Sequence, residues 1–241
     1  MRRFRAALLT TAAFAAIIGL AGCEQRADIK GDRPVVLLLD DQADFLQAGG
    51  RDPVASSQIP GLIQATNAVI DAAAKNNVPV SYVRDEFSPF DLVTFFEHSG
   101  AAPRLWAGSQ LDPSIGEWAG PYFTKTQDDA FTNSRLQGWL SMVEAGKLVI
   151  GGVFADSSVV ATTRGAIRRG FHVIVLSDAI AARTDADRDT ALKTLGDLGA
   201  HIQTSQEFIA SLASDAATAQ IPQPAIEYTN PNGLPGVGVR D

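Results

Sequence analysis

Residues 35–42 read VVLLLDDQ, five consecutive apolar residues followed at once by two aspartates and a glutamine. An uninterrupted apolar run rich in branched side chains is typical of a strand buried on both faces of a parallel sheet. Further apolar runs alternate with helical patterns, which predicts an α/β fold: a three-layer sandwich with a mostly parallel central sheet. We expect more strands over residues 79–83, 147–152, 172–177 and 200–204, and helices over 60–76, 133–145, 157–169, 186–198 and from 205 onward.

Polar residues follow several of the predicted strands. Residues 40–41, 84–86 and 152–158 each lie just past the end of one. In open parallel sheets, ligands bind beyond the carboxyl ends of the strands. We therefore expect the functional site at this edge. Residues 84–124, with several Pro, Gly and aromatic residues, are expected to form long loops, short elements and a pocket wall.

The N-terminus differs in kind from the rest of the chain. Three arginines among the first five residues precede residues 7–21, which are almost wholly apolar. A membrane-spanning helix needs roughly 20 apolar residues, so this shorter run predicts a secretory signal instead. Residues 20–23 read LAGC and resemble the lipobox of bacterial lipoproteins, in which the cysteine, here Cys23, carries the lipid. The alternative is an ordinary signal peptide that happens to contain a cysteine.

The lipobox resemblance implies both a location and a domain organisation. The lipid would hold the protein at the cell envelope on the periplasmic side. Because Glu24 rather than aspartate follows the cysteine, the outer membrane is favoured over the inner. We expect a signal peptide over residues 1–22, a lipidated tether over 23–33, one folded domain over 34–215 and an irregular tail over 216–241.

Composition and histidine spacing argue against several classes of protein. The chain has 46% hydrophobic and 20% charged residues, an ordinary globular balance. Its formal net charge of -7 disfavours a nucleic-acid partner. The histidines, His98, His172 and His201, are scattered, and two of them fall in predicted strands. This spacing disfavours a Ser-His-Asp triad and offers no pair of metal ligands.

Three segments, in order, resemble the isochorismatase-like (cysteine hydrolase) superfamily, and the resemblance extends over residues 34–212. Residues 38–45, LLDDQADF, are similar to its first-strand signature, in which an apolar strand ends in aspartate, then any residue, glutamine and, later, phenylalanine. Residues 125–131, KTQDDAF, are similar to its lysine segment. Residues 152–166, GVFADSSVVATTRGA, are similar to the segment that carries the nucleophilic cysteine. The resemblance implies the isochorismatase-like hydrolase fold.

The same resemblance implies roles residue by residue. Asp40 matches the catalytic aspartate, which moves protons, and Lys125 matches the lysine that stabilises anionic charge beside it. Ser158 occupies the position of the cysteine nucleophile. The Val153–Phe154 peptide matches a cis bond that helps to shape an oxyanion hole. Nicotinamidases carry Asp-x-His metal ligands after the second strand, whereas residues 85–87 read DEF, so we expect no metal and no other cofactor.

Without the resemblance, the same residues have plainer explanations. Residues 156–158 also fit the N-cap of a helix, Asp40 an Asx-type turn and Lys125 a solvated loop charge. If the implied roles hold, Asp40 and Lys125 form a buried pair that sets the proton affinity of the carboxylate. Ser158 then lies in the first turn of a helix, where backbone N–H groups favour negative charge.

The missing cysteine separates the functional hypotheses. Cys23 is the only cysteine, so thioester chemistry is excluded, and a serine hydroxyl is a weak nucleophile without a base. Some family members, isochorismatases among them, also lack the cysteine and hydrolyse a vinyl ether with the aspartate as proton donor and water as nucleophile. We favour a hydrolase that acts on a small molecule through Asp40 and Lys125. The alternatives are an inactive family member that serves as a ligand-binding or assembly lipoprotein, and an unrelated lipoprotein domain. Since family members often assemble, a homo-oligomer is compatible with either family hypothesis.

Overall fold

A single parallel sheet forms the centre of the molecule. The computed structural model describes residues 31–86, 101–102, 106–118 and 120–218. Its six strands lie in the order β3-β2-β1-β4-β5-β6, and every neighbouring pair is parallel. The strands are β1 (Arg33–Leu39), β2 (Val80–Asp85), β3 (Tyr122–Lys125), β4 (Ala145–Val153), β5 (His172–Ala181) and β6 (His201–Gln203). The predicted α/β class with a mostly parallel sheet is confirmed.

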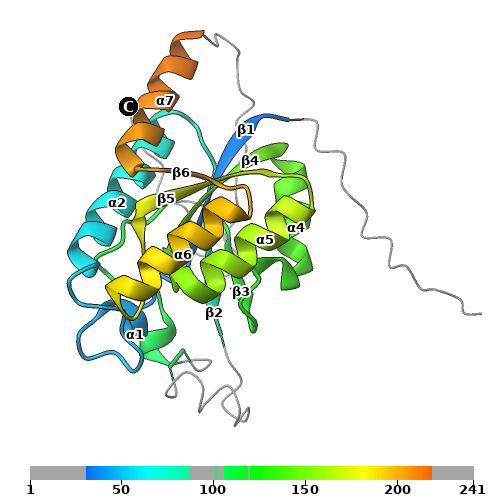
Figure 1. Ribbon diagram of the computed structural model, residues 1–241. Helices are drawn as coiled ribbons and strands as arrows, with labels where there is room; N and C mark the ends of the chain where they lie inside the picture. The colour runs from blue at the N-terminus through cyan, green and yellow to red at the C-terminus, as the bar shows by residue number, and fades with distance from the viewer. Residues whose placement is uncertain (1–30, 87–100, 103–105, 119, 219–241) are drawn as a thin grey trace, which may run out of the picture.

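Helices cover both faces of the sheet, which gives three layers (Figure 1). One layer contains α1 (Ala43–Leu46), α2 (Ile59–Lys75) and α7 (Ser205–Thr218). The other contains α4 (Ser134–Met142), α5 (Val160–Arg168) and α6 (Asp185–Asp197). Short 3-10 turns lie at Ala107–Ser109 and Ala130–Thr132. Within the described ranges, none of the helices is both long and apolar enough to cross a membrane.

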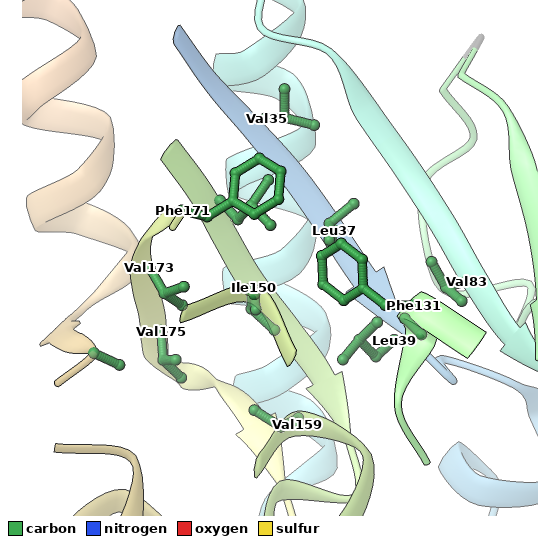
Figure 2. Packing of buried hydrophobic residues seen from close by; sticks show 14 of the residues in the cluster. Val35, Leu37, Leu39, Val83, Phe131, Ile150, Val159, Phe171, Val173 and Val175 are labelled. Atoms are coloured by element: carbon green, nitrogen blue, oxygen red, sulfur yellow. The ribbon is translucent and has the colours of Figure 1, made fainter. Parts of the chain in front are cut away.

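Strand β1 lies between two hydrophobic clusters, as its apolar run predicts. Val35, Leu37 and Leu39 pack toward α4, α5 and α6, in the cluster drawn in Figure 2. Val36 and Leu38 belong to the cluster on the opposite face, with α2 and α7. All five side chains are at most 1% exposed. Full burial of such a side chain contributes about 1.5–3 kcal/mol, so this strand anchors both layers.

The structure differs from the prediction at the ends of several elements and, more clearly, at β3 and α7. Strand β3 lies in the segment expected to form loops and short elements. It is a four-residue edge strand in which only Phe123 and Lys125 are buried, so it carries too little apolar pattern to be recognised. Helix α7 continues to Thr218, past the predicted boundary at residue 215, because residues 216–218 read AAT and contain no helix breaker.

Several predictions fall on residues that the structure does not describe. The described part of the chain begins at residue 31, after the proposed signal peptide, Cys23 and most of the tether. It also leaves out His98 and, past residue 218, the rest of the predicted tail. The other two histidines, His172 and His201, are the first residues of β5 and β6. They therefore lie at the amino edge of the parallel sheet, opposite the edge where the site was predicted.

Candidate active site

Four polar side chains meet at the carboxyl edge of the sheet, contributed by four neighbouring strands. Lys125 is the last residue of β3, Asp85 the last of β2, and Asp40 directly follows β1. Ser158 lies in the single π-helical turn, Ala155–Val159, that follows β4. Each of the four residues is at most 3% exposed. The structure therefore brings the three predicted residues together and adds Asp85.

The ammonium group of Lys125 joins the other three side chains. Its Nζ lies 2.8 Å from Asp40 Oδ2 and donates a hydrogen bond of 3.0 Å to Ser158 Oγ. The same nitrogen forms an ion pair and a short hydrogen bond with Asp85 Oδ1. The ammonium thus has three polar partners, which equals the number of its N–H donors. Lys125 is thus a buried ion-pair partner rather than a solvated loop charge.

Burial and the two carboxylates act on Lys125 in opposite directions. Burial alone would lower the pKa of Lys125, but the negative charges of Asp40 and Asp85 together raise it above its ordinary value. The lysine therefore stays charged at physiological pH and cannot serve as a base. Burial also raises the pKa of Asp40, and the charge of Lys125 and hydrogen bonds from Lys125 and Ser158 only partly offset this effect. The buried pair therefore favours the protonated form of each of its two members.

Asp85 and Gln42 are site residues that the sequence analysis did not assign. Asp85 and Lys125 are register partners in neighbouring parallel strands, so their side chains leave the same face of the sheet. The Gln42 amide accepts from the Asp85 N–H at 2.8 Å and donates to the Asp85 carbonyl at 3.0 Å. This bidentate contact ties the end of β2 to the chain just past β1. A polar residue at the end of an apolar strand was the signal available for Asp85.

The chain between β4 and Ser158 has unusual backbone geometry. Gly152 has a φ of +116°, and the Val153–Phe154 peptide bond is cis. The Phe154 ring packs edge-on against Phe45, with ring centroids 5.1 Å apart. The π-helical turn begins after Phe154 and has no side-chain cap, so the N-cap explanation for residues 156–158 does not describe this structure. Ser158 Oγ instead accepts from the lysine.

The isochorismatase domain model matches residues 34–207 of this chain. This chain belongs to the isochorismatase family. The zebrafish (Danio rerio) isochorismatase domain-containing protein 2 is 27% identical over 104 residues, which span 43% of this chain and 53% of that protein. The chain therefore spans about half the length of this curated relative. The family model ends at residue 207, eight residues before the domain boundary at residue 215 that the sequence analysis predicts.

Solved structures support the isochorismatase-like fold. A cysteine hydrolase from Pseudomonas syringae pv. phaseolicola 1448A has a TM-score of 0.69 and 21% identity, covering 76% of this chain and 93% of that one. An N-carbamoylsarcosine amidase from Thermoplasma acidophilum has a TM-score of 0.63 and 25% identity, covering 72% and 96%. The predicted isochorismatase-like fold is therefore confirmed.

The described residues do not fit the metal site known from the nicotinamidase branch of the family. Asp85 occupies the first ligand position, but its carboxylate holds the Lys125 ammonium. Glu86 and Phe87 follow, so the histidine ligand is absent from the sequence. Among the described residues, no three His, Cys, Asp or Glu side chains converge as a metal site. That this chain binds no metal remains a prediction.

Asp41 is a buried carboxyl group beside the site. It is 3% exposed, and neither of its oxygens has a hydrogen-bond partner. Burial, together with the nearby charges of Asp40 and Asp112, raises the pKa of Asp41 well above its ordinary value. The family signature allows any residue at this position, so the carboxyl group is a feature of this chain rather than of the motif.

The raised pKa of Asp41 makes stability depend on pH. Because the folded state holds this proton more tightly than the unfolded chain, the free energy of unfolding falls as pH rises above about 4. Asp41→Asn removes this slope, and we expect it to stabilise the protein at pH 8 but not at pH 4. The gain is about 1.4 kcal/mol for each unit by which the pKa is raised.

Urea unfolding at several pH values measures this difference. Asp71→Asn, on an exposed position of α2, is the matched control for the loss of one negative charge. If the free energy of unfolding depends on pH in the same way in Asp41→Asn and Asp71→Asn, the charged form of Asp41 does not destabilise the folded state.

Proposed function

We propose that this protein is a hydrolase that acts on a small molecule through the Asp40–Lys125 pair, with Ser158 at the position of the family's cysteine. The observation that carries the proposal is the contact of one buried ammonium with both Asp40 and Ser158. The amidase and the cysteine hydrolase of similar fold, both named as hydrolases, support the same class of reaction. The name of the curated relative states no substrate.

Asp40 suits the role of general acid. Its raised pKa favours a protonated carboxyl that can donate to the substrate, and Lys125 remains beside it as a fixed positive charge. Once Asp40 has protonated the substrate, water adds to the activated carbon and returns a proton to Asp40. The resulting hemiketal or tetrahedral adduct then breaks down and releases the leaving group as an alcohol. This route consumes one water and needs neither a thiol nor a covalent intermediate. Vinyl ethers, and esters with a good leaving group, are substrates of this kind.

Ser158 is poorly suited to act as the nucleophile. Its Oγ accepts a hydrogen bond from Lys125, and a positive charge at that distance lowers the electron density available for attack. The described histidines lie at the opposite edge of the sheet, and among the described residues the base that contacts the hydroxyl is the Asp40 carboxylate. A carboxylate is a weak base for a serine hydroxyl. We therefore assign Ser158 no covalent role, and Lys125 keeps its two carboxylate partners when the hydroxyl is removed.

The test is a hydrolysis screen with the full-length protein against small vinyl ethers, esters and amides. We expect Asp40→Asn to lower kcat by about 10²–10⁴-fold, the usual contribution of general acid catalysis, and Ser158→Ala to keep most activity. Asn also tolerates the left-handed backbone of Asp40, whose φ is +56°, so this variant tests the carboxyl group alone.

Two other outcomes would contradict this mechanism. Loss of activity in both variants would make Ser158 a working nucleophile. No turnover by the parent, with amidase activity appearing only in Ser158→Cys, would indicate an inactive scaffold with a ligand-binding or assembly role. The observation that favours this second candidate is that Ser158, and not a cysteine, stands at the position of the family's nucleophile.

We further propose that the N-terminal lipid on Cys23 tethers this activity to the cell envelope, with the outer membrane favoured. The support is the sequence of residues 1–24 alone. Cys23→Ala should move the protein from the membrane fraction to the soluble fraction, and an unchanged distribution would contradict a lipid tether. A homo-oligomer remains a proposal that sedimentation of the purified protein would test.

A further inference from the structure

Two buried carboxylates, not one, contact the lysine of the site. Lys125 Nζ is 2.8 Å from Asp40 Oδ2 and also pairs with Asp85, and the side chains of Lys125 and Asp40 have no exposed surface. Among the described residues, the ion pairs of this nitrogen therefore join one positive and two negative groups when all are ionised. Asp85 matches neither of the motif residues that the proposed hydrolysis uses, so its charge needs a separate explanation.

A single carboxylate would make proton transfer by Asp40 costly. If Asp40 were the only counter-ion, each protonation of Asp40 would leave a buried ammonium without a compensating charge. A buried ion that loses its partner is strongly disfavoured. Asp40 would then remain locked as a carboxylate, unable to donate a proton. With Asp85 paired to the same nitrogen, the lysine keeps one negative partner whether or not Asp40 carries a proton.

The backbone holds Asp85 in this position independently of Asp40. Asp85 and Lys125 are register partners of β2 and β3, and the Glu86 N–H donates to the Lys125 carbonyl at 2.9 Å. Gln42 binds the N–H and the carbonyl of Asp85, and its amide also donates to the Ser109 carbonyl at 2.9 Å. These contacts fix the carboxylate of Asp85 beside the ammonium, so it does not have to move when Asp40 changes its protonation state.

We infer that Asp85 is a positioning residue, the permanent counter-ion that keeps Lys125 charged and in place while Asp40 gains and loses its proton. The inference rests on the proposed role of Asp40 in proton transfer. It assigns to Asp85 a function that acts through Lys125, without contact with the substrate. Within the described part of the chain, the Asp41 carboxyl is a further titratable group beside Asp40, and it is the same in every variant described below.

The test is the titration of Asp40, followed by carboxyl ¹³C NMR on the full-length protein in detergent. In Asp85→Asn the charge of Lys125 acts on Asp40 alone, so we expect the midpoint of Asp40 to move down by about one pH unit or more. Asp85→Glu keeps the charge and should restore most of the parent midpoint. Asp32→Asn removes a charge before β1, at the opposite edge of the sheet, and should leave the midpoint unchanged. An unchanged Asp40 midpoint in folded Asp85→Asn overturns the inference.

A second measurement needs no variant and remains decisive if Asp85→Asn does not fold. In the parent protein, the ¹⁵N signal of the Lys125 ammonium should persist across the whole titration of Asp40. Loss of that signal, or deprotonation of Lys125 as Asp40 takes up its proton, overturns the inference. Neither measurement uses turnover, so a parent protein that hydrolyses nothing would contradict the proposed function without deciding the role of Asp85. Where a substrate is found, the alkaline limb of the pH–rate profile, on which Asp40 loses the proton that it donates, should move with the NMR midpoint.

Discussion

At pH 8, Lys125→Met is expected to lower the free energy of unfolding by about 3–5 kcal/mol, the usual cost of breaking a buried ion pair on one side. Methionine fills a similar volume, so the loss is electrostatic rather than a packing defect. It leaves Asp40 and Asp85 buried without their shared ammonium. Removing Lys125 takes away the positive charge that lowers the pKa of Asp40, so this pKa rises further in the folded state and the loss should be larger at pH 8 than at pH 5.

Two further variants separate this effect from a general loss of charge. Combining Lys125→Met with Asp40→Asn and Asp85→Asn removes the unpaired charges and should recover much of the stability. Lys147→Met breaks the exposed pair with Asp32, in which Nζ and Oδ1 are 3.2 Å apart, and should cost less than about 1 kcal/mol. Urea unfolding followed by circular dichroism measures all three. If Lys125→Met lowers the free energy of unfolding by less than about 1 kcal/mol, the site tolerates the two buried carboxylates without the ammonium of Lys125.

The second large effect is expected at Gly152. This residue has a φ of +116°, and a Cβ there would lie 1.9 Å from the Leu39 carbonyl oxygen, an atom of the backbone that cannot move aside. Leu39 and Gly152 are register partners of β1 and β4, directly before Asp40. Gly152→Ala should therefore destabilise the protein by about 3 kcal/mol or more. It should also abolish any Asp40-dependent activity, because the end of β1 must shift.

Gly138 supplies the matched control for Gly152. It lies inside helix α4, and a Cβ at this position would meet nothing within 4 Å. Gly138→Ala should raise the free energy of unfolding by about 0.5–1 kcal/mol, because alanine favours the helix. Thermal unfolding of the two variants should therefore shift in opposite directions. If Gly152→Ala unfolds at the temperature of the parent, the close approach of β1 and β4 is not needed for the fold.

These two predictions concern the same structural arrangement. The close approach at Gly152 brings the end of β4 against the end of β1. The turn that follows β4 then places Ser158 within hydrogen-bond distance of Lys125, although their strands are separated in the sheet by β2 and β1. The lysine side chain and the turn that follows β4 together cover that separation. Stability and the geometry of the site therefore depend on the same few contacts at the carboxyl edge.

The sequence by itself determined the class of fold and three of the four residues that meet at the site. The apolar run of residues 35–39 predicts a strand buried on both faces because its pattern is local and admits few alternatives. The motif segments around Asp40, Lys125 and Ser158 likewise lie within short stretches of chain. Each is readable without knowledge of its neighbours in space.

Only the tertiary structure decided what these residues contact. Strand β3 is too short and too polar to be recognised, and it exists because β2 offers it hydrogen bonds along one edge. The pairing of Asp85 with Lys125 depends on the register between those two strands, and the unpartnered state of Asp41 depends on the packing around it. Sequence patterns report burial along one segment. The balance of charges in a buried site depends on which segments of the chain meet there. Only the long-range pairing of strands decides which segments meet.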